Sequence, residues 1–342
     1  MCLDGRAAAL LLAAASILPA VTPHPSQTSA ATPAKAVSVT VNLIGPKARL
    51  LTAAVVTLHR DDEVSGAADS GNTPVAIAGD GSFVFSNVPP GTYRIQARAA
   101  GGGIDSPLVA VYRIVVQTRD LTVPLMLRPG ASLSGHLVFE ASNRAALPRL
   151  TGLRIQAVPS DDGIDMIAAD VLRDGSFRMT GIAPGRHLLT VAGLPEPWAL
   201  DRATYRGADI SDSGVEADSG QSMAGVRVLV TANTTDVSGT VRDRAGRVVA
   251  GATVLIIPAA PRFWIRGGRR LGRTASRDDG GYRYRGLPAG EYRVAAVQLE
   301  NEDIYEPELL HRLSAAGAPL TLAPHAGAVI DLVVPPAAAA AR

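Results

Sequence analysis

A short motif occurs three times along the chain and restricts the folds that the sequence can adopt. The copies occupy residues 80–95, 174–189 and 279–294. Each copy begins with Asp-Gly, carries an aromatic residue two positions later, and then has a turn sequence rich in proline and glycine. Successive copies begin about one hundred residues apart, an interval typical of whole domains and not of solenoid repeats. We therefore expect three tandem domains of one kind.

The residues within each copy predict two β-strands joined by a turn. Asp-Gly supplies the positive φ of a tight turn. Phe83 and Phe85, like Tyr282 and Tyr284, alternate along the chain and so place an aromatic stripe on one sheet face. Proline and glycine then end the first strand, because proline fixes φ and lacks an N–H donor. Residues 93–98 alternate again and begin the second strand.

Further strands flank each motif on both sides. Residues 237–243 open the third unit with Val-Ser-Gly-Thr-Val, and residues 133–138 open the second unit with a similar run that contains glycine. Residues 37–41 open the first unit without that glycine. The units close on β-rich runs at residues 121–127, 226–230 and 329–334. Only a few residues separate one closing run from the next opening run, which predicts modules joined with little free linker.

The Val-x-Gly-x-Val opening, the Asp-Gly-x-Phe/Tyr turn and the Pro-x-Gly-x-Tyr turn together resemble carboxypeptidase regulatory-like domains. These domains are small transthyretin-like (Ig-like) β-sandwiches found in many bacterial envelope proteins. The resemblance covers most of residues 36–336 and is best in the third unit. It implies an all-β chain with sandwiches at residues 36–129, 130–232 and 233–336. The terminal prolines and alanine run predict a disordered tail at residues 337–342. The resemblance implies no particular function, because this sandwich is a generic module.

The N-terminal residues predict export. Residues 7–18 form an apolar run preceded by Arg6, which is too short to span a bilayer and typical of a signal-peptide core. We assign residues 1–30 to a signal peptide and leader. The single cysteine, Cys2, lies in this leader, so we expect no disulfide bonds in the exported chain. We expect a periplasmic or extracellular protein with no transmembrane segment in the mature chain.

The sequence carries no recognisable catalytic or cofactor-binding motif. It lacks a His-Glu-x-x-His pattern, a Gly-x-Ser-x-Gly elbow, a phosphate-binding loop and a dinucleotide-binding fingerprint. We therefore predict a protein that is not an enzyme and that holds no metal and no cofactor. The net charge of +2 is close to neutral and gives no reason to expect a nucleic acid partner.

One arginine-rich segment is the main candidate for ligand binding. Residues 262–273 contain five arginines around a Phe-Trp-Ile cluster. In a binding site, the tryptophan would stack on a sugar ring while the arginines hold anionic groups. The alternative is structural: a hairpin around Gly267-Gly268 whose charge is neutralised by the acidic segment 300–308. The candidate ligand-binding residues are Trp264, Arg266, Arg269, Arg270 and, in the second unit, Trp198.

Outside that segment, three features have a structural interpretation. Trp198 is either a glycan-stacking residue or a hydrophobic plug, at the end of the second sandwich or at a domain junction. Asp209 and Asp212 belong to an acidic cluster without the ordered spacing of a calcium loop, and we interpret them as solvated turn residues. Residues 307–316 begin with proline and precede Gly317, which predicts a helix that packs its leucines on the third sandwich.

We predict a non-catalytic exported binding or structural protein whose modules act as spacers or docking surfaces. Its partner would be an extracellular polysaccharide or an envelope protein. A polysaccharide-binding protein is the first alternative, and an accessory subunit of an exported hydrolase is the second. An exposed tryptophan on a sheet or loop would favour the polysaccharide, whereas a contiguous exposed apolar patch would favour a protein partner.

Overall fold

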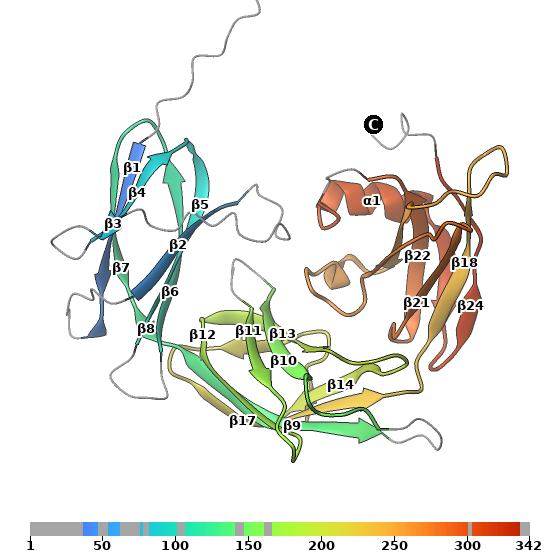
Figure 1. The fold of residues 1–342 in the computed structure, drawn as a ribbon, viewed down its shortest axis with the longest axis horizontal. Helices are drawn as coiled ribbons and strands as arrows, with labels where there is room; N and C mark the ends of the chain where they lie inside the picture. Colours follow the sequence, from blue (N-terminus) through green and yellow to red (C-terminus); the bar gives the residue numbers. More distant parts are fainter. Residues whose placement is uncertain are drawn as a thin grey trace, which may run out of the picture. The chain divides into compact units, whose positions relative to one another are not determined.

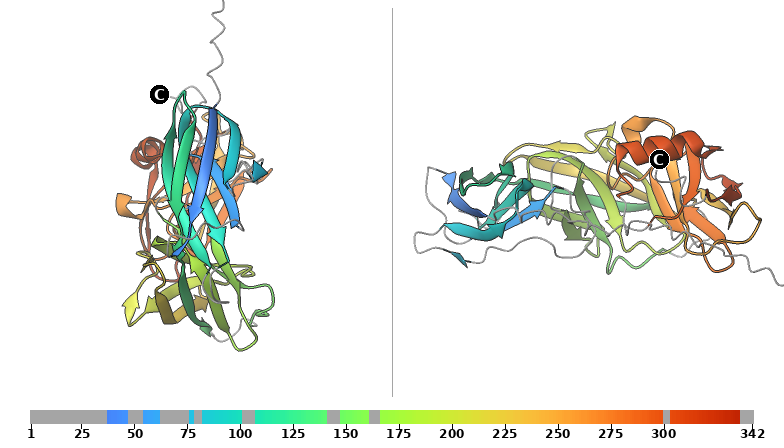
Figure 2. Two further views of the ribbon diagram at one scale, coloured as in Figure 1. Left: turned by 90° about the vertical axis from the view of Figure 1, so that its left-hand side faces the viewer. Right: turned by 90° about the horizontal axis from the view of Figure 1, so that it is seen from above.

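The computed structural model describes residues 37–46, 54–61, 76–77, 82–100, 107–140, 147–160, 166–299 and 303–335 (Figures 1 and 2). Strands make up most of this part of the chain, so the predicted all-β fold is confirmed. The predicted signal peptide and leader, residues 1–30, and the predicted tail, residues 337–342, lie outside the described residues. No helix among the described residues is long and apolar enough to cross a membrane.

The first repeat folds into two four-stranded sheets. Its strands are β1 (Val37–Ile44), β2 (Ala54–Arg60), β3 (Ala76–Ile77), β4 (Phe83–Val88), β5 (Gly91–Ala99), β6 (Leu108–Val116), β7 (Leu121–Met126) and β8 (Arg128–Pro129). One sheet has the order β3-β4-β1-β7 and the other has the order β2-β5-β6-β8. Along β1 every second side chain is buried, as the period of two in an extended strand requires.

The second repeat has the same plan with one addition. Its strands are β9 (Ala131–Glu140), β10 (Arg154–Pro159), β11 (Ile167–Asp170), β12 (Ser176–Ile182), β13 (Gly185–Ala192), β14 (Ala199–Tyr205), β15 (Ala208–Asp209), β16 (Val215–Ala217) and β17 (Ser222–Thr231). The sheet orders are β12-β9-β17-β14-β15 and β11-β10-β13-β16. The hairpin β14–β15 therefore extends one sheet beyond the closing strand β17.

The third repeat adds a helix to this plan. Its elements are β18 (Asp236–Arg242), β19 (Thr253–Pro258), the 3₁₀ helix η2 (Pro261–Phe263), β20 (Gly272–Ala275), β21 (Gly281–Arg285), β22 (Gly290–Val297), α1 (Pro307–Ala316), β23 (Ala318–Leu322), β24 (Gly327–Val329) and β25 (Leu332–Val333). One sheet has the order β21-β18-β24, with β25 also paired to β18, and the other has the order β20-β19-β22-β23.

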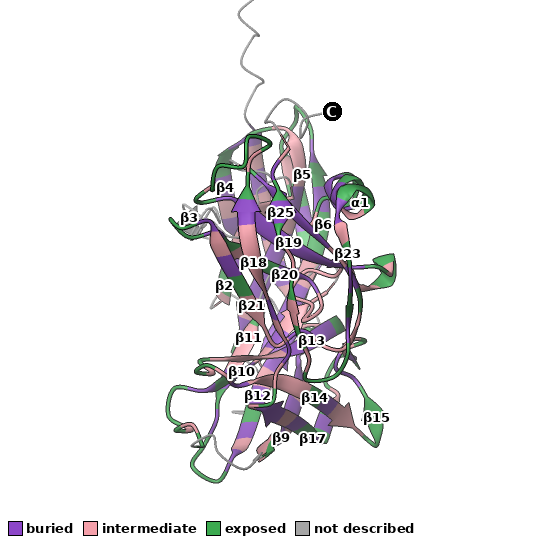
Figure 3. Cartoon of the chain, turned by 90° about the vertical axis from the view of Figure 1, so that its right-hand side faces the viewer, coloured by how far each residue is buried: buried purple, intermediate pink, exposed green. Residues whose placement is uncertain are grey.

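Each pair of sheets encloses its own cluster of buried apolar side chains. Figure 3 colours the buried residues of the cartoon purple. The clusters extend over residues 37–127, 131–230 and 237–334. Two sheets packed face to face around such a cluster form a β-sandwich, as the repeats predict. The domain boundaries after residues 129 and 232 stay predictions.

The helix α1 is confirmed at the predicted residues, Pro307–Ala316. Proline suits the first turn of a helix, because a backbone N–H there has no acceptor within the helix and its absence costs no hydrogen bond. Leu309, Leu310 and Leu313 are buried and pack with side chains of β19 and β22, such as Leu255. The helix thus covers the face of this sheet that points away from the sandwich core.

The proline-glycine turn of the motif carries the chain from one sheet to the other. β4, β12 and β21 lie in one sheet of each pair, and β5, β13 and β22 lie in the other. The Tyr93 hydroxyl donates to the Pro89 carbonyl oxygen at 2.9 Å, and the Tyr292 hydroxyl donates to the Pro288 oxygen at 2.7 Å. In the second copy His187 replaces the tyrosine, and its Nδ1 lies 3.0 Å from the carbonyl oxygen two residues earlier. In the first and third copies the tyrosine thus ties the start of the second strand to the turn before it.

The Asp-Gly step forms the predicted tight turn in both copies that the structure describes. Gly175 has a φ of 81° and Gly280 a φ of 75°, values that favour glycine. Asp174 Oδ1 accepts hydrogen bonds from the Ser176 backbone N–H at 2.9 Å and from its hydroxyl. These bonds from Ser176, the side-chain one foremost, lower the pKa of Asp174. The Asp-Gly step of the first copy, residues 80–81, lies outside the described residues.

The glycine of the opening strand makes room for an irregular closing strand. The opening strand pairs in parallel with the closing one, β9 with β17 and β18 with β24 and β25. A Cβ on Gly135 would lie 1.9 Å from the Val226 carbonyl oxygen, and one on Gly239 would lie 1.8 Å from the Ile330 oxygen. In the first sandwich β1 pairs with β7 without a shift of register. The first unit therefore needs no glycine there.

Gly239→Ala should lower the free energy of unfolding by about 1–3 kcal/mol, because the added methyl group overlaps the Ile330 oxygen and the strands must move apart. Urea unfolding measures the effect. Ser238→Ala on the same strand is the control, since its side chain is partly exposed. Equal stability of the two variants would contradict the steric explanation.

Candidate functional site

The arginine-rich segment connects the antiparallel strands β19 and β20. Residues 259–271 pass through the 3₁₀ helix η2 and then a turn in which the Gly268 N–H donates to the Ile265 oxygen at 2.9 Å. Gly267 has a φ of 73°, a conformation that favours glycine. The predicted hairpin around Gly267-Gly268 is therefore confirmed.

Trp264 is half-buried against the third sandwich. Its indole N–H donates to the Pro258 carbonyl oxygen at 2.8 Å. Its ring meets His311 of α1 edge to face, with the centroids 4.6 Å apart, and it packs against the apolar cluster beneath α1. These contacts hold the indole in place, and its role as a platform for a sugar ring stays a prediction.

Arg266 is paired within the third sandwich. Its guanidinium forms an ion pair with Asp303 and stands 4.4 Å from the centroid of the Tyr305 ring. Asp303 belongs to the acidic segment that was expected to neutralise the loop. Glu300 and Glu302 of the same segment lie outside the described residues.

Asp212 of the second sandwich accepts hydrogen bonds from both Arg269 and Arg270 of the third. Arg269 Nε donates to Oδ1 at 2.8 Å, and Arg270 Nε donates to Oδ2 at 2.8 Å. Arg269 also donates to the backbone oxygen of Asp201, and Arg270 donates to that of Ala289 at 3.1 Å. The three charged side chains are between 15% and 22% exposed. We call Asp212, Arg269 and Arg270 the Asp212 joint.

Two glycines let the third sandwich lie directly against the second. A Cβ on Gly267 would lie 2.9 Å from Val158 Cγ1, and a Cβ on Gly286 would lie 2.7 Å from the Cβ of Ala199. Both glycines have positive φ. The Arg285 guanidinium adds an ion pair at 2.6 Å to Glu196 of the second sandwich.

Asp236, at the start of β18, neutralises two arginines of the neighbouring strand β21. Its carboxylate accepts hydrogen bonds from Arg283 Nε at 2.8 and 2.9 Å, and Arg285 Nε lies at 3.4 Å. The hydrogen bond from Arg283 is the main reason why the pKa of Asp236 is lowered.

Trp198 lies in the core of the second sandwich, where only 7% of it is exposed. Its ring meets Phe139 edge to face at a centroid distance of 5.2 Å. This placement agrees with the alternative role of a hydrophobic plug and leaves the indole without an open face for a sugar ring. The structure therefore does not bring Trp198 together with the arginine-rich loop.

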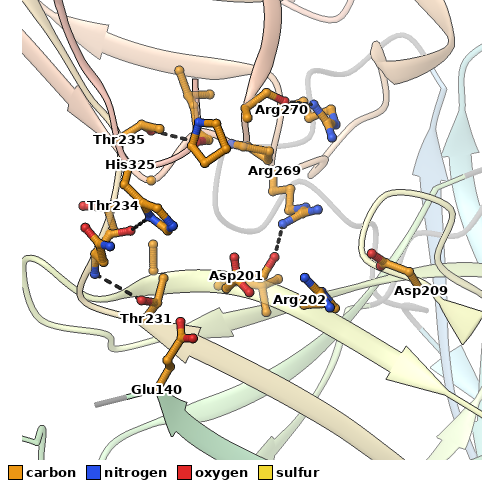
Figure 4. Close-up of a pocket in the computed structure, with 18 residues that line it drawn as sticks. Glu140, Asp201, Arg202, Asp209, Thr231, Thr234, Thr235, Arg269, Arg270 and His325 are labelled. Atoms are coloured by element: carbon orange, nitrogen blue, oxygen red, sulfur yellow. Dashed lines mark hydrogen bonds between the residues drawn. The ribbon is translucent and has the colours of Figure 1, made fainter. Parts of the chain in front are cut away.

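A polar pocket of about 400 Å³ lies beside the Asp212 joint. Figure 4 shows Thr234 and His325 to one side of it, and Asp201 and Arg269 to the other. The lining includes residues 199–202 of β14, the short connection at residues 233–235, and the turn at residues 286–289. Within the described residues, no group of three or more His, Cys, Asp or Glu side chains is placed to hold a metal ion.

Sequence reasoning selected both arginines of the joint but missed Asp212 and the pocket. From the sequence we interpret Asp212 as a solvated turn residue, because no residue near it in the chain indicates which group it pairs with. Fifty-seven residues separate it from Arg269. Asp201 was not selected at all, since it is a single carboxylate in an otherwise ordinary strand.

Comparison with protein families gives one match. Residues 236–309 match the model of the carboxypeptidase regulatory-like domain. The matched stretch runs from β18 into α1 and contains both the third copy of the motif and the arginine-rich loop. The predicted resemblance is confirmed for this part of the chain. A comparison with curated proteins gave no match.

Solved structures with similar folds include two pilins and one further bacterial protein. The Bacillus anthracis TIE protein is 14% identical with a TM-score of 0.22, over 88% of this chain and 50% of that chain, so this chain spans half of its length. BcpA, the major pilin subunit of Bacillus cereus, is 11% identical with a TM-score of 0.21, over 87% and 99%. GBS52, the minor pilin of Streptococcus agalactiae, is 10% identical with a TM-score of 0.30, over 57% and 95%. At these values the likeness carries no argument about function.

Asp212→Asn should loosen the contact between the second and third sandwiches. The substitution removes the charge that two largely buried guanidinium groups share, and we expect a loss of about 1–3 kcal/mol in the free energy of unfolding. Hydrogen exchange measured by mass spectrometry should quicken at residues 267–270 and 286–289. Asp170→Asn, which breaks the exposed pair with Arg154, is the matched control. Unchanged exchange rates in both variants would show that the Asp212 joint does not stabilise the contact between the two sandwiches.

Asp236 should make stability depend on acid pH. Because its folded-state pKa is lowered, its contribution is complete above the unfolded-state pKa of about 4 and is lost as pH falls through the folded-state value. The difference in unfolding free energy between the wild type and Asp236→Asn should therefore stay constant above about pH 5 and shrink as the pH falls below about 4. Urea titrations at several pH values measure it, with the exposed Asp278→Asn as control. A constant difference would rule out the ionised pair as its source.

Proposed function

We propose that the chain is an exported, non-catalytic protein whose sandwiches act as spacers and present docking surfaces to proteins of the bacterial envelope. A spacer must transmit position from one module to the next, so its junctions have to resist bending. The observation that carries this proposal is the Asp212 joint, in which the arginine-rich loop of one sandwich is fixed to a carboxylate of another.

The junction between the first and second sandwiches supports the same role. Gly130 is the residue between β8 and β9, and its N–H donates to the Pro107 oxygen at 2.9 Å. A Cβ on Gly130 would lie 2.6 Å from Gly181 Cα. Arg98 of the first sandwich donates to the Gly181 carbonyl oxygen at 3.0 Å. Both junctions are thus short and carry direct contacts between modules.

Exposed apolar side chains on the second sandwich support docking to a protein. Leu147 is 61% exposed and lines an open groove together with Leu137 and Phe139. Leu172 is 58% exposed on the same sandwich. Apolar side chains gathered at a groove gain from contact with another protein, since that contact removes them from water.

Binding to isolated envelope fragments of the producing bacterium tests the proposal. We expect the purified protein to sediment with the fragments, and to stop doing so after the fragments are digested with protease. Leu147→Asp should weaken the binding by about tenfold, whereas Val55→Asp, at an equally exposed valine of the first sandwich, should not. Binding that survives protease and disappears after glycan digestion would replace this proposal with the polysaccharide-binding alternative.

A further inference from the structure

The pocket beside the Asp212 joint is shaped by two sandwiches at once. On one side lie Asp201 and Arg202 of β14 and Glu140 at the end of β9 (Figure 4). The other side is formed by the third sandwich, through the turn at residues 286–289 and the loop that carries His325. A volume of about 400 Å³ is within the usual range for small-molecule sites.

The charges around the pocket disfavour an anionic ligand. Arg269 and Arg270 reach the pocket, but both donate to the Asp212 carboxylate and to backbone oxygens. Arg202 lies beside Asp209, and its positive charge is one of the influences on that carboxyl group. Two further carboxylates, Glu140 and Asp201, line the same space. An anion entering the pocket would therefore meet repulsion that no unengaged pair of arginines offsets.

The hydrogen-bonding groups favour a ligand that both donates and accepts. Asp201 is half-buried, and no hydrogen bond to its carboxylate is made by another described residue. Such a group is costly to desolvate unless something donates to it. The hydroxyl of Thr234 lies across the pocket and can both donate and accept. Leu200 and Pro288, both partly exposed, add apolar surface to the lining.

We propose that this pocket binds a short, uncharged saccharide. The hydroxyl groups of a sugar donate to carboxylates and accept from hydroxyl and amide donors, and its C–H faces rest on aliphatic side chains. This is an activity beyond protein docking, and it requires neither Trp264 nor Trp198. Because both sandwiches line the pocket, a bound saccharide also stabilises their contact, as any ligand stabilises the state that binds it.

Direct titration of the full-length protein tests the site. Cellobiose and N,N′-diacetylchitobiose serve as uncharged probes of plant-type and bacterial-wall-type glycans. Cellobiouronic acid and inorganic phosphate serve as the anionic probes. Saturation-transfer NMR detects binding and calorimetry measures the Kd. We expect at least one uncharged disaccharide to bind, and to bind at least about tenfold more tightly than either anion.

Asp201→Asn should weaken that binding by about tenfold or more, because it removes a charged acceptor while keeping the size of the side chain. Thr234→Val, which removes one hydroxyl, should weaken it several-fold and remains informative if Asp201→Asn fails to fold. Asp170→Asn makes the same chemical change outside the pocket and should leave the Kd unchanged. Absence of binding by both uncharged probes, preference for an anion, or an unchanged Kd in both pocket variants would overturn the proposal. None of these results bears on protein docking, which depends on the envelope-fragment experiment.

Discussion

The first and last strands of each repeat pair in parallel, and this pairing sets the path of the whole chain. β1 lies between β4 and β7, β9 lies between β12 and β17, and β18 lies between β21 and β24. This pairing joins the two ends of a repeat and completes one sheet over the core. Since the two strands run in the same direction, the chain enters a sandwich at one end and leaves it at the other. A second sandwich can then follow with only a few residues between them.

That chain path brings the arginine-rich loop of the third sandwich to the edge of the second. Arginine suits this contact because its planar guanidinium holds several donors in fixed directions and remains charged when partly buried. Arg269 and Arg270 each donate to Asp212 and, through a different nitrogen, to a backbone oxygen. The loop therefore holds the contact through the fixed directions of its guanidinium donors as well as through their charge. The same contact forms one wall of the polar pocket at Asp201.

Most of the fold could be predicted because its signals are local. The alternation of Phe83 and Phe85, the Asp-Gly turns, and the proline and glycine that bound residues 307–316 each act within a few positions of the chain. Even the missing glycine of the first unit was visible in the sequence, although its reason was not. That reason is the regular pairing of β1 with β7, which leaves room for a side chain.

Local patterns along the chain were enough to predict the sandwich, its repetition, the hairpin at Gly267-Gly268 and the helix. The partners of the arginines depend instead on how two sandwiches pack. Arg269 and Arg270 are candidates for an anion site in the sequence and partners of Asp212 in the fold. The role of a charged side chain depends on the groups within a few ångströms of it, because the interaction between charges weakens with distance. For this loop those neighbours come from another sandwich, at a distance along the chain that no local pattern records.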